Sequence, residues 1–132
     1  MKKELEDIIC AAAPKLMRDM RGDMTKTCLA FGFECGDGWF SLLLEAATEL
    51  EALGTDVRAA QVKEKFGTLR FYVAGTTAEN FQTIEEIIVR AERRSSLECE
   101  TCGAAGSRGN GNGRRGYIQT LCDKHSEAKD QD

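Results

Sequence analysis

Residues 99 to 125 read CETCGAAGSRGNGNGRRGYIQTLCDKH and contain three of the six cysteines and the one histidine of the chain. Two residues separate Cys99 from Cys102, and two separate Cys122 from His125. Such a spacer lets both side chains of a pair reach one ion, and three thiolates with one imidazole form a tetrahedral donor set that suits zinc. The spacing therefore predicts one zinc ion, bound by these four residues.

The segment between the two pairs supports the same interpretation. It is 19 residues long, which is within the range typical of zinc modules. Gly103 supplies the backbone freedom for a tight knuckle, and LCDKHSEAK indicates the start of a helix that carries the second pair. A knuckle, a glycine-rich hairpin or loop, and such a helix form a treble-clef zinc finger. Four protein ligands close the metal shell, so we interpret the site as structural.

Three other uses of these residues fit the sequence less well. A redox pair at Cys99 and Cys102 is expected at the amino end of a helix that follows a strand, whereas this pair follows a predicted helix. Buried thiols beside an unrelated histidine would leave both spacings a coincidence. Zinc-dependent nucleobase deaminases place a His-x-Glu pair before their cysteines, and this chain has its histidine last.

Composition limits the class of protein. A length of 132 residues suits a single domain, and a formal net charge of −4 argues against a molecule that binds nucleic acid over its whole surface. Glu4, Glu6 and Asp7 interrupt the place where a secretory signal would be apolar. No segment has the ~20 apolar residues that span a bilayer. We expect a cytoplasmic protein whose thiols are reduced and which does not enter a membrane.

Hydrophobic periodicity predicts an α+β fold. A short helix kinked at Pro14 leads to an extended stretch, CLAFGFECGDGW, which ends in a tight turn. VRAAQVKEKFGTLRFYVAG predicts an antiparallel hairpin that turns at Gly67. We expect residues 1–97 to form a core of helices packed on this short β-hairpin. Residues 98–132 then form a treble-clef-like zinc-binding module packed on the core, in a single compact domain overall.

Two further helices have specific end signals. The first carries apolar residues at helical spacing, is capped by Asp37 and stops at Gly54. Its apolar residues are Trp39, Leu43, Ala46, Leu50 and Leu53. The second is predicted over residues 77–95, after a capping box formed by Thr76 and Glu79. Its apolar residues are Phe81, Ile84, Ile88 and Ala91.

The sequence argues against an enzyme. With His125 bound to metal, no histidine remains as a general base. Cys35 could be a nucleophile ahead of a helix, but a small buried residue is the simpler interpretation, and Cys10 and Cys28 are also assigned to the core. Asp37 is more simply a helix cap than a metal or phosphate ligand. No GxxxxGK[ST] or GxGxxG motif is present to bind phosphate.

Two surfaces are candidates for nucleic-acid contact. Arg108, Arg114 and Arg115 lie in a glycine-rich loop beside Tyr117, and arginines with an aromatic can hold phosphates and bases. Arg90, Arg93 and Arg94 precede the knuckle, although Glu92, Glu98 and Glu100 lie among them, so a solvated loop of mixed charge is the alternative. The hairpin carries Lys63, Lys65, Arg70 and Tyr72, where the alternative is charge that protects an exposed sheet edge.

The blocks CGDGWF, QVKEKFGTLRFYV, AERRSSLECETCGAAG and LCDKH, over roughly residues 31 to 125, resemble a group of small bacteriophage and prophage proteins without an assigned activity. The resemblance implies a phage or prophage accessory protein in the cytoplasm of a bacterial host cell. Such a protein would act by binding a host protein, as an anti-defence inhibitor, including an anti-CRISPR, or as a host-takeover adaptor. The expanded RGNGNGRRG loop departs from the group's pattern and leaves the partner surface open. The second hypothesis is a nucleic-acid-binding transcriptional regulator that uses this loop, and the third is a redox or hydrolytic enzyme.

Overall fold

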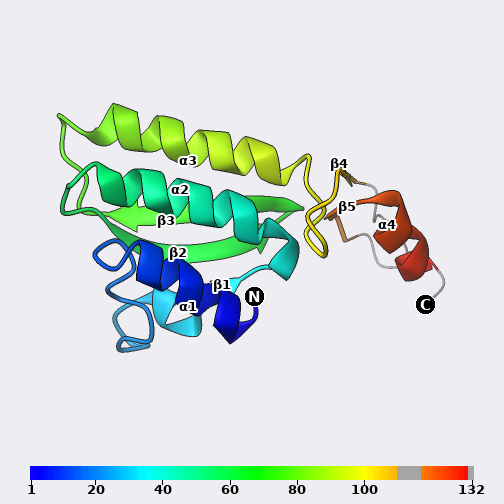
Figure 1. Ribbon diagram of the computed structural model, residues 1–132, viewed down its shortest axis with the longest axis horizontal. Coiled ribbons are helices and arrows are strands. Elements are labelled where there is room, and N and C mark those ends of the chain that lie inside the picture. The colour runs from blue at the N-terminus through cyan, green and yellow to red at the C-terminus, as the bar shows by residue number, and fades with distance from the viewer. Residues whose placement is uncertain (110–116, 131–132) are drawn as a thin grey trace.

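The computed structural model describes residues 1–109 and 117–130. Its elements in chain order are α1 (Lys3–Ala12), the 3₁₀ helix η1 (Cys28–Phe31), β1 (Phe33–Glu34), the 3₁₀ helix η2 (Asp37–Trp39), α2 (Phe40–Ala52), β2 (Arg58–Lys65), β3 (Thr68–Ala74), α3 (Phe81–Ser95), β4 (Ser107–Arg108), β5 (Thr120–Leu121) and α4 (Asp123–Asp130). Helices α1, α2 and α3 lie side by side on one face of the larger sheet, and β4, β5 and α4 lie together beyond one end of it (Figure 1). The predicted α+β class is confirmed.

The larger sheet has the order β1-β2-β3, with β2 in the centre. Strands β2 and β3 form the predicted antiparallel hairpin, and its turn holds Phe66 and Gly67 at φ values of 54° and 85°. The prediction of a hairpin alone was incomplete, because β1 pairs with β2 in parallel and places Phe33 beside Val62. Most of the predicted extended stretch is instead 3₁₀ helix and turn. A strand of two residues is too short to show an alternating pattern.

Side chains from the helices close both edges of this sheet. On the β1 side, the amide of Phe33 donates to the carboxylate of the buried Glu6 over 2.7 Å. On the β3 side, the amide of Leu69 donates to Ser95 Oγ over 2.9 Å, and the amide of Phe71 donates to Glu92 over 3.1 Å. These bonds occupy amides that would otherwise pair with another chain. The fold therefore satisfies part of each of its two edge strands.

Helix α2 follows the predicted apolar spacing. Trp39 and Leu43 are fully buried, whereas Leu53 lies beyond the last helical residue and is 38% exposed. Gly54 follows at a φ of 67°, as its role as a stop signal requires. The predicted cap was wrong: Asp37 does not bond to the first turn of α2, because its carboxylate accepts the backbone N–H of Lys2 over 2.8 Å.

Helix α3 begins four residues later than the prediction, at Phe81. The capping box at Thr76 and Glu79 was wrong, because the reciprocal bonds join Thr77 and Asn80. Thr77 Oγ1 accepts the amide of Asn80 over 3.3 Å, and Asn80 Oδ1 accepts the amide of Thr77 over 2.8 Å. Phe81, at the first helical position, is 55% exposed and does not join the core. The other three apolar positions of α3 are buried as predicted: Ile84, Ile88 and Ala91.

The main core lies between the helices and the sheet. Its largest fully buried side chains include Trp39, Phe33, Ile9, Leu42, Leu43, Leu69 and Ile84. Helix α1 ends at Ala12, just before Pro14. Over residues 1–109 and 117–130, none of the helices combines the length and apolar character needed to cross a membrane.

The three cysteines outside the C-terminal cluster differ in environment. Cys35 is buried, as the sequence predicted. Cys10 is only half-buried, and Cys28 is exposed, so the assignment of Cys28 to the core was wrong. Cys28 opens η1 at the rim of the sheet, where the short 3₁₀ turn directs Leu29 inward in its place.

Candidate metal centre

Cys99, Cys102, Cys122 and His125 converge on one point. One potential ligand atom from each lies within 4.8 Å of the others. Cys102 Sγ is 3.8 Å from Cys122 Sγ, and His125 Nδ1 is 3.6 Å from Cys99 Sγ and 3.2 Å from Cys122 Sγ. The two pairs that the sequence singled out therefore share one site, and its atoms are close enough to coordinate one metal ion.

The first pair lies on a tight knuckle. An isolated β-bridge between Glu98 and Ala105 brings the two ends of the knuckle together. Within it, the amide of Gly103 donates to the carbonyl of Cys99 over 2.8 Å, and Gly103 adopts a φ of 83°. This left-handed conformation is the backbone freedom that the sequence predicted for position 103.

The second pair reaches the knuckle through a small sheet. Strands β4 and β5 pair so that Ser107 lies opposite Leu121, and the amide of Glu100 donates to the carbonyl of Thr120 over 2.9 Å. Cys122 follows β5 directly, and His125 lies in the first turn of α4, as predicted. Cys99 and Leu121 are almost completely buried and form a small second core with Cys122.

The backbone around the site favours thiolate at one ligand. Burial raises the pKa of the Cys99 thiol, but hydrogen bonds from the backbone N–H groups of Cys122, Cys102 and Thr101 outweigh it and bring that pKa down to about 6. A metal ion binds the thiolate form of cysteine and offsets the charge that converging thiolates bring together. The site thus presents at least one ligand in the form that a cation requires.

The CGDGW block forms the support beneath the knuckle. The amide of Gly38 donates to the carbonyl of Glu100 over 2.8 Å, and the amide of Gly36 donates to the Glu100 carboxylate over 2.9 Å. The indole N–H of the fully buried Trp39 donates to the carbonyl of Glu98 over 2.9 Å. The first pair of ligands is therefore held against the main core by a segment some 60 residues earlier in the chain.

The turn of the β2–β3 hairpin supports the other side of the site. Thr120 Oγ1 donates to the carbonyl of Gly67 over 2.7 Å, and Arg108 Nε donates to the carbonyl of Phe66 over 2.9 Å. A β-carbon at Gly67 would come within 3.2 Å of Ile118. The CGDGW block thus contacts the segment that carries Cys99 and Cys102, and the hairpin turn contacts the segment that leads to Cys122.

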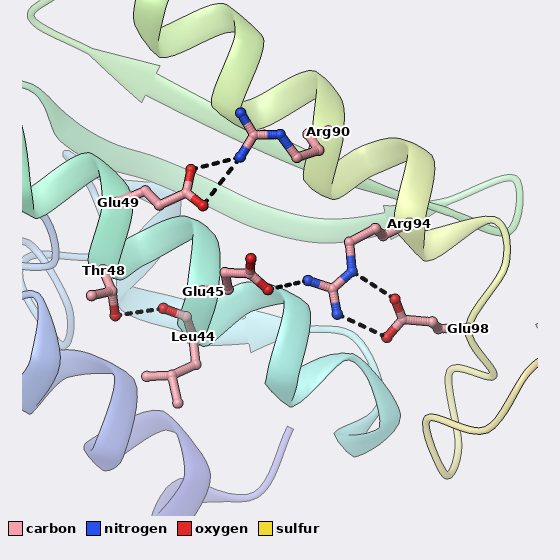
Figure 2. A network of polar contacts seen from close by, with 7 residues as sticks. All are labelled: Leu44, Glu45, Thr48, Glu49, Arg90, Arg94 and Glu98. Atoms are coloured by element: carbon pink, nitrogen blue, oxygen red, sulfur yellow. Dashed lines mark hydrogen bonds and ion pairs between the residues drawn. The ribbon is translucent and has the colours of Figure 1, made fainter.

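Arg94 belongs to a polar network between helices rather than to an open surface (Figure 2). Its guanidinium is paired with Glu45 of α2 and, over 2.7 Å, with Glu98 beside the knuckle. One turn earlier, Arg90 donates to both carboxylate oxygens of Glu49 over 3.1 and 2.8 Å. The network joins α2 to α3 and fixes Glu98, whose carbonyl also holds Trp39.

The remaining predicted contact residues have different surroundings. Tyr117 is 68% exposed beside the module. Arg108 is exposed but its Nε is occupied by the hairpin turn. Arg114 and Arg115 lie outside the described residues.

Sequence reasoning missed the groups that support the ligands, namely Gly36, Gly38, Trp39, Glu98 and Thr120. The two glycines in CGDGW were the available signal, since a glycine often marks a close approach of another backbone. No protein-family model, curated protein or solved structure matches this chain.

Proposed function

We propose that the chain is a zinc-stabilised, non-enzymatic binding protein whose C-terminal segment is a treble-clef-like module. The order of knuckle, β-hairpin and ligand-bearing helix supports that description of the module. The observation that carries the proposal is the convergence of four protein ligands on one point, because four ligands leave no position for water or substrate.

The distances between the ligand atoms fit zinc. Bond lengths of about 2.3 Å to sulfur and about 2.0 Å to nitrogen, at tetrahedral angles, separate two sulfurs by about 3.8 Å and sulfur from nitrogen by about 3.5 Å. The Cys102–Cys122 sulfur separation is 3.8 Å, and His125 Nδ1 is 3.6 Å from Cys99 Sγ, whereas its distance of 3.2 Å from Cys122 Sγ is shorter than the ideal value. A donor set of three sulfurs and one imidazole suits zinc better than magnesium or calcium, which prefer oxygen.

The surroundings of Cys35 support a non-enzymatic role. Burial raises the pKa of this thiol to about 12, so it carries no thiolate at neutral pH. A nucleophilic cysteine needs a lowered pKa or an adjacent base, and the only histidine of the chain belongs to the metal cluster. The structural context of Cys35 is that of a core residue.

The resemblance to phage and prophage proteins supports a host protein as the partner, in the cytoplasm of a bacterial cell. Inhibition of a defence complex, including a CRISPR complex, and host takeover are the corresponding roles. The test is a pull-down from bacterial lysate with the zinc-loaded, tagged chain, with and without nuclease. A host protein captured despite nuclease should then form a stoichiometric complex when both proteins are purified, and failure of that reconstitution would contradict the proposal.

A nucleic-acid-binding regulator is the second candidate. The predicted contacts of the Arg/Gly loop give it limited support, because Arg94 is held by two carboxylates and Arg108 by the hairpin turn. On another surface, the β2–β3 hairpin, the cations Lys63, Lys65 and Arg70 form no ion pair within the described residues, and this observation favours the second candidate. Capture of nucleic acid, or of proteins that are lost on nuclease treatment, would support it over a host-protein partner.

A further inference from the structure

Among residues 1–109 and 117–130, the α-helices α1, α2 and α3 pack on one face of the larger sheet and no α-helix packs on the other (Figure 1). Residues that point toward the helices are buried, including Val62, Leu69 and Phe71. Side chains on the other face alternate with them and remain at least partly accessible. At the end far from the turn, Arg58 lies opposite Ala74 and pairs with Asp19 over 3.1 Å. Nearer the turn they are Gln61 opposite Tyr72, Lys63 opposite Arg70, and Lys65 opposite Thr68. We refer to these six residues as the open face.

Protection of a sheet edge does not explain the open face. Lys63 and Lys65 lie on β2, which is the central strand of the sheet. One amide of β1 and two amides of β3 are already bonded to Glu6, Ser95 and Glu92. At Lys63, which lies between β1 and β3, charge therefore has no edge to protect, whereas Lys65 lies beyond the residues that pair with β1.

The positive charge of the open face is also poorly compensated. Several lysine and arginine side chains elsewhere pair with carboxylates, as Lys15 does with Asp56 and Arg90 with Glu49, although exposed cations such as Lys26 and Arg93 do not pair with any described residue. In the part of the chain that the structure describes, the three cations of the open face, Lys63, Lys65 and Arg70, form no ion pair. The carboxylates that face them are Glu34, which lies opposite Lys63 on β1, and Glu92, which interacts with Arg70 electrostatically.

This arrangement has a cost for folding. Lys63 and Arg70 are directly opposite each other in the antiparallel pair, where like charges destabilise a sheet. The protein has 22 acidic residues against 18 basic ones, so a carboxylate at either position would be in keeping with its composition. A cluster of cations that is unfavourable for stability and only partly compensated by Glu34 and Glu92 is suited to a polyanionic ligand.

Aromatic side chains accompany the cations along the same surface. Tyr72 is 47% exposed on the open face, and Phe66 is 59% exposed at the turn, with the Lys65 ammonium 5.6 Å from its ring centre. Beside Tyr72, a hollow of about 640 Å³ lies between the open face and the segment that contains Lys26 and Cys28, and both basic side chains, such as Lys26, and the carboxylates Asp19 and Asp23 line it. At the opposite end, Arg108 contacts the turn.

We propose that the open face binds a single-stranded nucleic acid, with Lys63, Lys65 and Arg70 on its phosphates and Tyr72 stacked on a base. Exposed aromatics interleaved with cations recognise unpaired bases, because a base presents its flat face only when it is free of a duplex. The eight residues of β2 span about 26 Å, which suits a short single strand. This site goes beyond the proposed host-protein partner and gives the second candidate function a surface.

Fluorescence anisotropy with the zinc-loaded full chain tests the proposal. The probes are labelled single-stranded DNA and RNA of about 12 nucleotides and a DNA duplex of the same length, measured between about 50 and 200 mM salt. Lys63→Gln with Arg70→Gln removes two phosphate contacts. The matched control, Lys3→Gln with Arg93→Gln, removes one lysine and one arginine charge from helices α1 and α3.

We expect both single strands to bind more tightly than the duplex. The open-face double variant should weaken binding on the order of tenfold and reduce the slope of log affinity against log salt by about 1.4. Tyr72→Ala should weaken binding about tenfold without changing that slope. Tyr72→Phe should retain the wild-type affinity, because phenylalanine still stacks on a base. The matched control should bind like the wild type, and circular dichroism should show that every variant is folded.

Several results would overturn the site. They are absence of binding at low salt, preference for the duplex, an equal loss in the matched control, or a loss found only in Arg114→Gln with Arg115→Gln. The last result would move nucleic-acid binding to the Arg/Gly loop. Absence of oligonucleotide binding together with a reconstituted host-protein complex would reject this inference while the proposed function stands.

Discussion

Gly38 lies so close to the metal-binding knuckle that a β-carbon at this position would stand 2.1 Å from the carbonyl oxygen of Cys99. The same hypothetical carbon would be 2.7 Å from the amide nitrogen of Cys102. Real β-carbons do not approach backbone atoms so closely, so only glycine permits this packing. The first two predicted metal ligands therefore depend on a residue that precedes them by some 60 positions.

Gly38→Ala should consequently weaken metal binding, since the knuckle must move away from its support. We expect a loss of metal affinity of at least tenfold, measured by competition with a chromogenic chelator, and a fall in the free energy of unfolding of about 2 kcal/mol or more. Gly54→Ala is the control, because Gly54 has a φ of 67° but a β-carbon there would have no atom within 4 Å. It should cost about 1 kcal/mol and leave metal affinity unchanged.

Trp39→Phe tests the second link between core and knuckle. Phenylalanine retains most of the buried surface but removes the N–H that Glu98 accepts, so a carbonyl beside the first ligand loses its partner. We expect a loss of stability of about 1–3 kcal/mol together with weaker metal binding. Leu50→Val, at the far end of α2, should cost about 1 kcal/mol and leave the metal affinity as it is. Equal metal affinities in both variants would argue that the indole bond plays no part in holding the site.

Native mass spectrometry should find one zinc ion per chain. A strong chelator, or Cys122→Ser, should remove the ion and lower the melting temperature, because metal binding contributes to folding of the module. Cys28→Ser changes an exposed thiol outside the cluster and should retain the full metal content. A metal-free wild-type chain with an unchanged melting temperature would contradict a structural role for the ion.

Thiol labelling should distinguish Cys28 from Cys35. Burial raises the pKa of Cys35 to about 12, whereas Cys28 is exposed. In the zinc-loaded protein at about pH 8, we expect iodoacetamide to modify Cys28 and to leave Cys35 intact, as read by peptide mass spectrometry. Rapid modification of Cys35 in the folded protein would contradict its assignment to the core and reopen a nucleophilic role.

Glu92 should make stability depend on pH. Burial raises the pKa of this carboxyl above 4.5, although the amide of Phe71 and the charge of Arg70 lower it in part. The native state then binds the proton more tightly than the unfolded state. Glu92 therefore contributes most stability below pH 4.5, and this contribution is lost as the pH rises through its folded pKa.

Glu92→Gln replaces the titrating carboxyl and so removes the loss of stability at higher pH. The amide oxygen of glutamine can still accept the N–H of Phe71. The stability of the variant relative to wild type should thus increase from about pH 4.5 upward and then level off, measured by urea unfolding. Asp7→Asn should behave in the opposite sense, since hydrogen bonds from Arg21 and Lys3 lower the pKa of Asp7. Its relative stability should fall as the pH rises, and parallel pH curves for the two variants would contradict the assignment.

Local spacing was sufficient to predict the candidate ligands. Two residues separate the members of each pair, Cys99 with Cys102 and Cys122 with His125. The local backbone alone therefore brings the two side chains of a pair together. The helix that carries Trp39 and the hairpin at Gly67 were predicted for the same reason, since their patterns repeat over a few residues. The caps at Asp37 and Thr76 were predicted wrongly, because the Asp37 carboxylate accepts the amide of Lys2 and the reciprocal bonds before α3 join Thr77 and Asn80.

Sequence by itself thus determined the four candidate ligands and the main helices and hairpin, because each depends on neighbours in the chain. Only the tertiary structure decided what supports the site and which surface is left open. Trp39 meets Glu98, Gly67 meets Thr120, and β1 places β2 at the centre of the sheet. These contacts join residues far apart in the chain, where spacing carries no information and the packing of the whole core determines which groups come together.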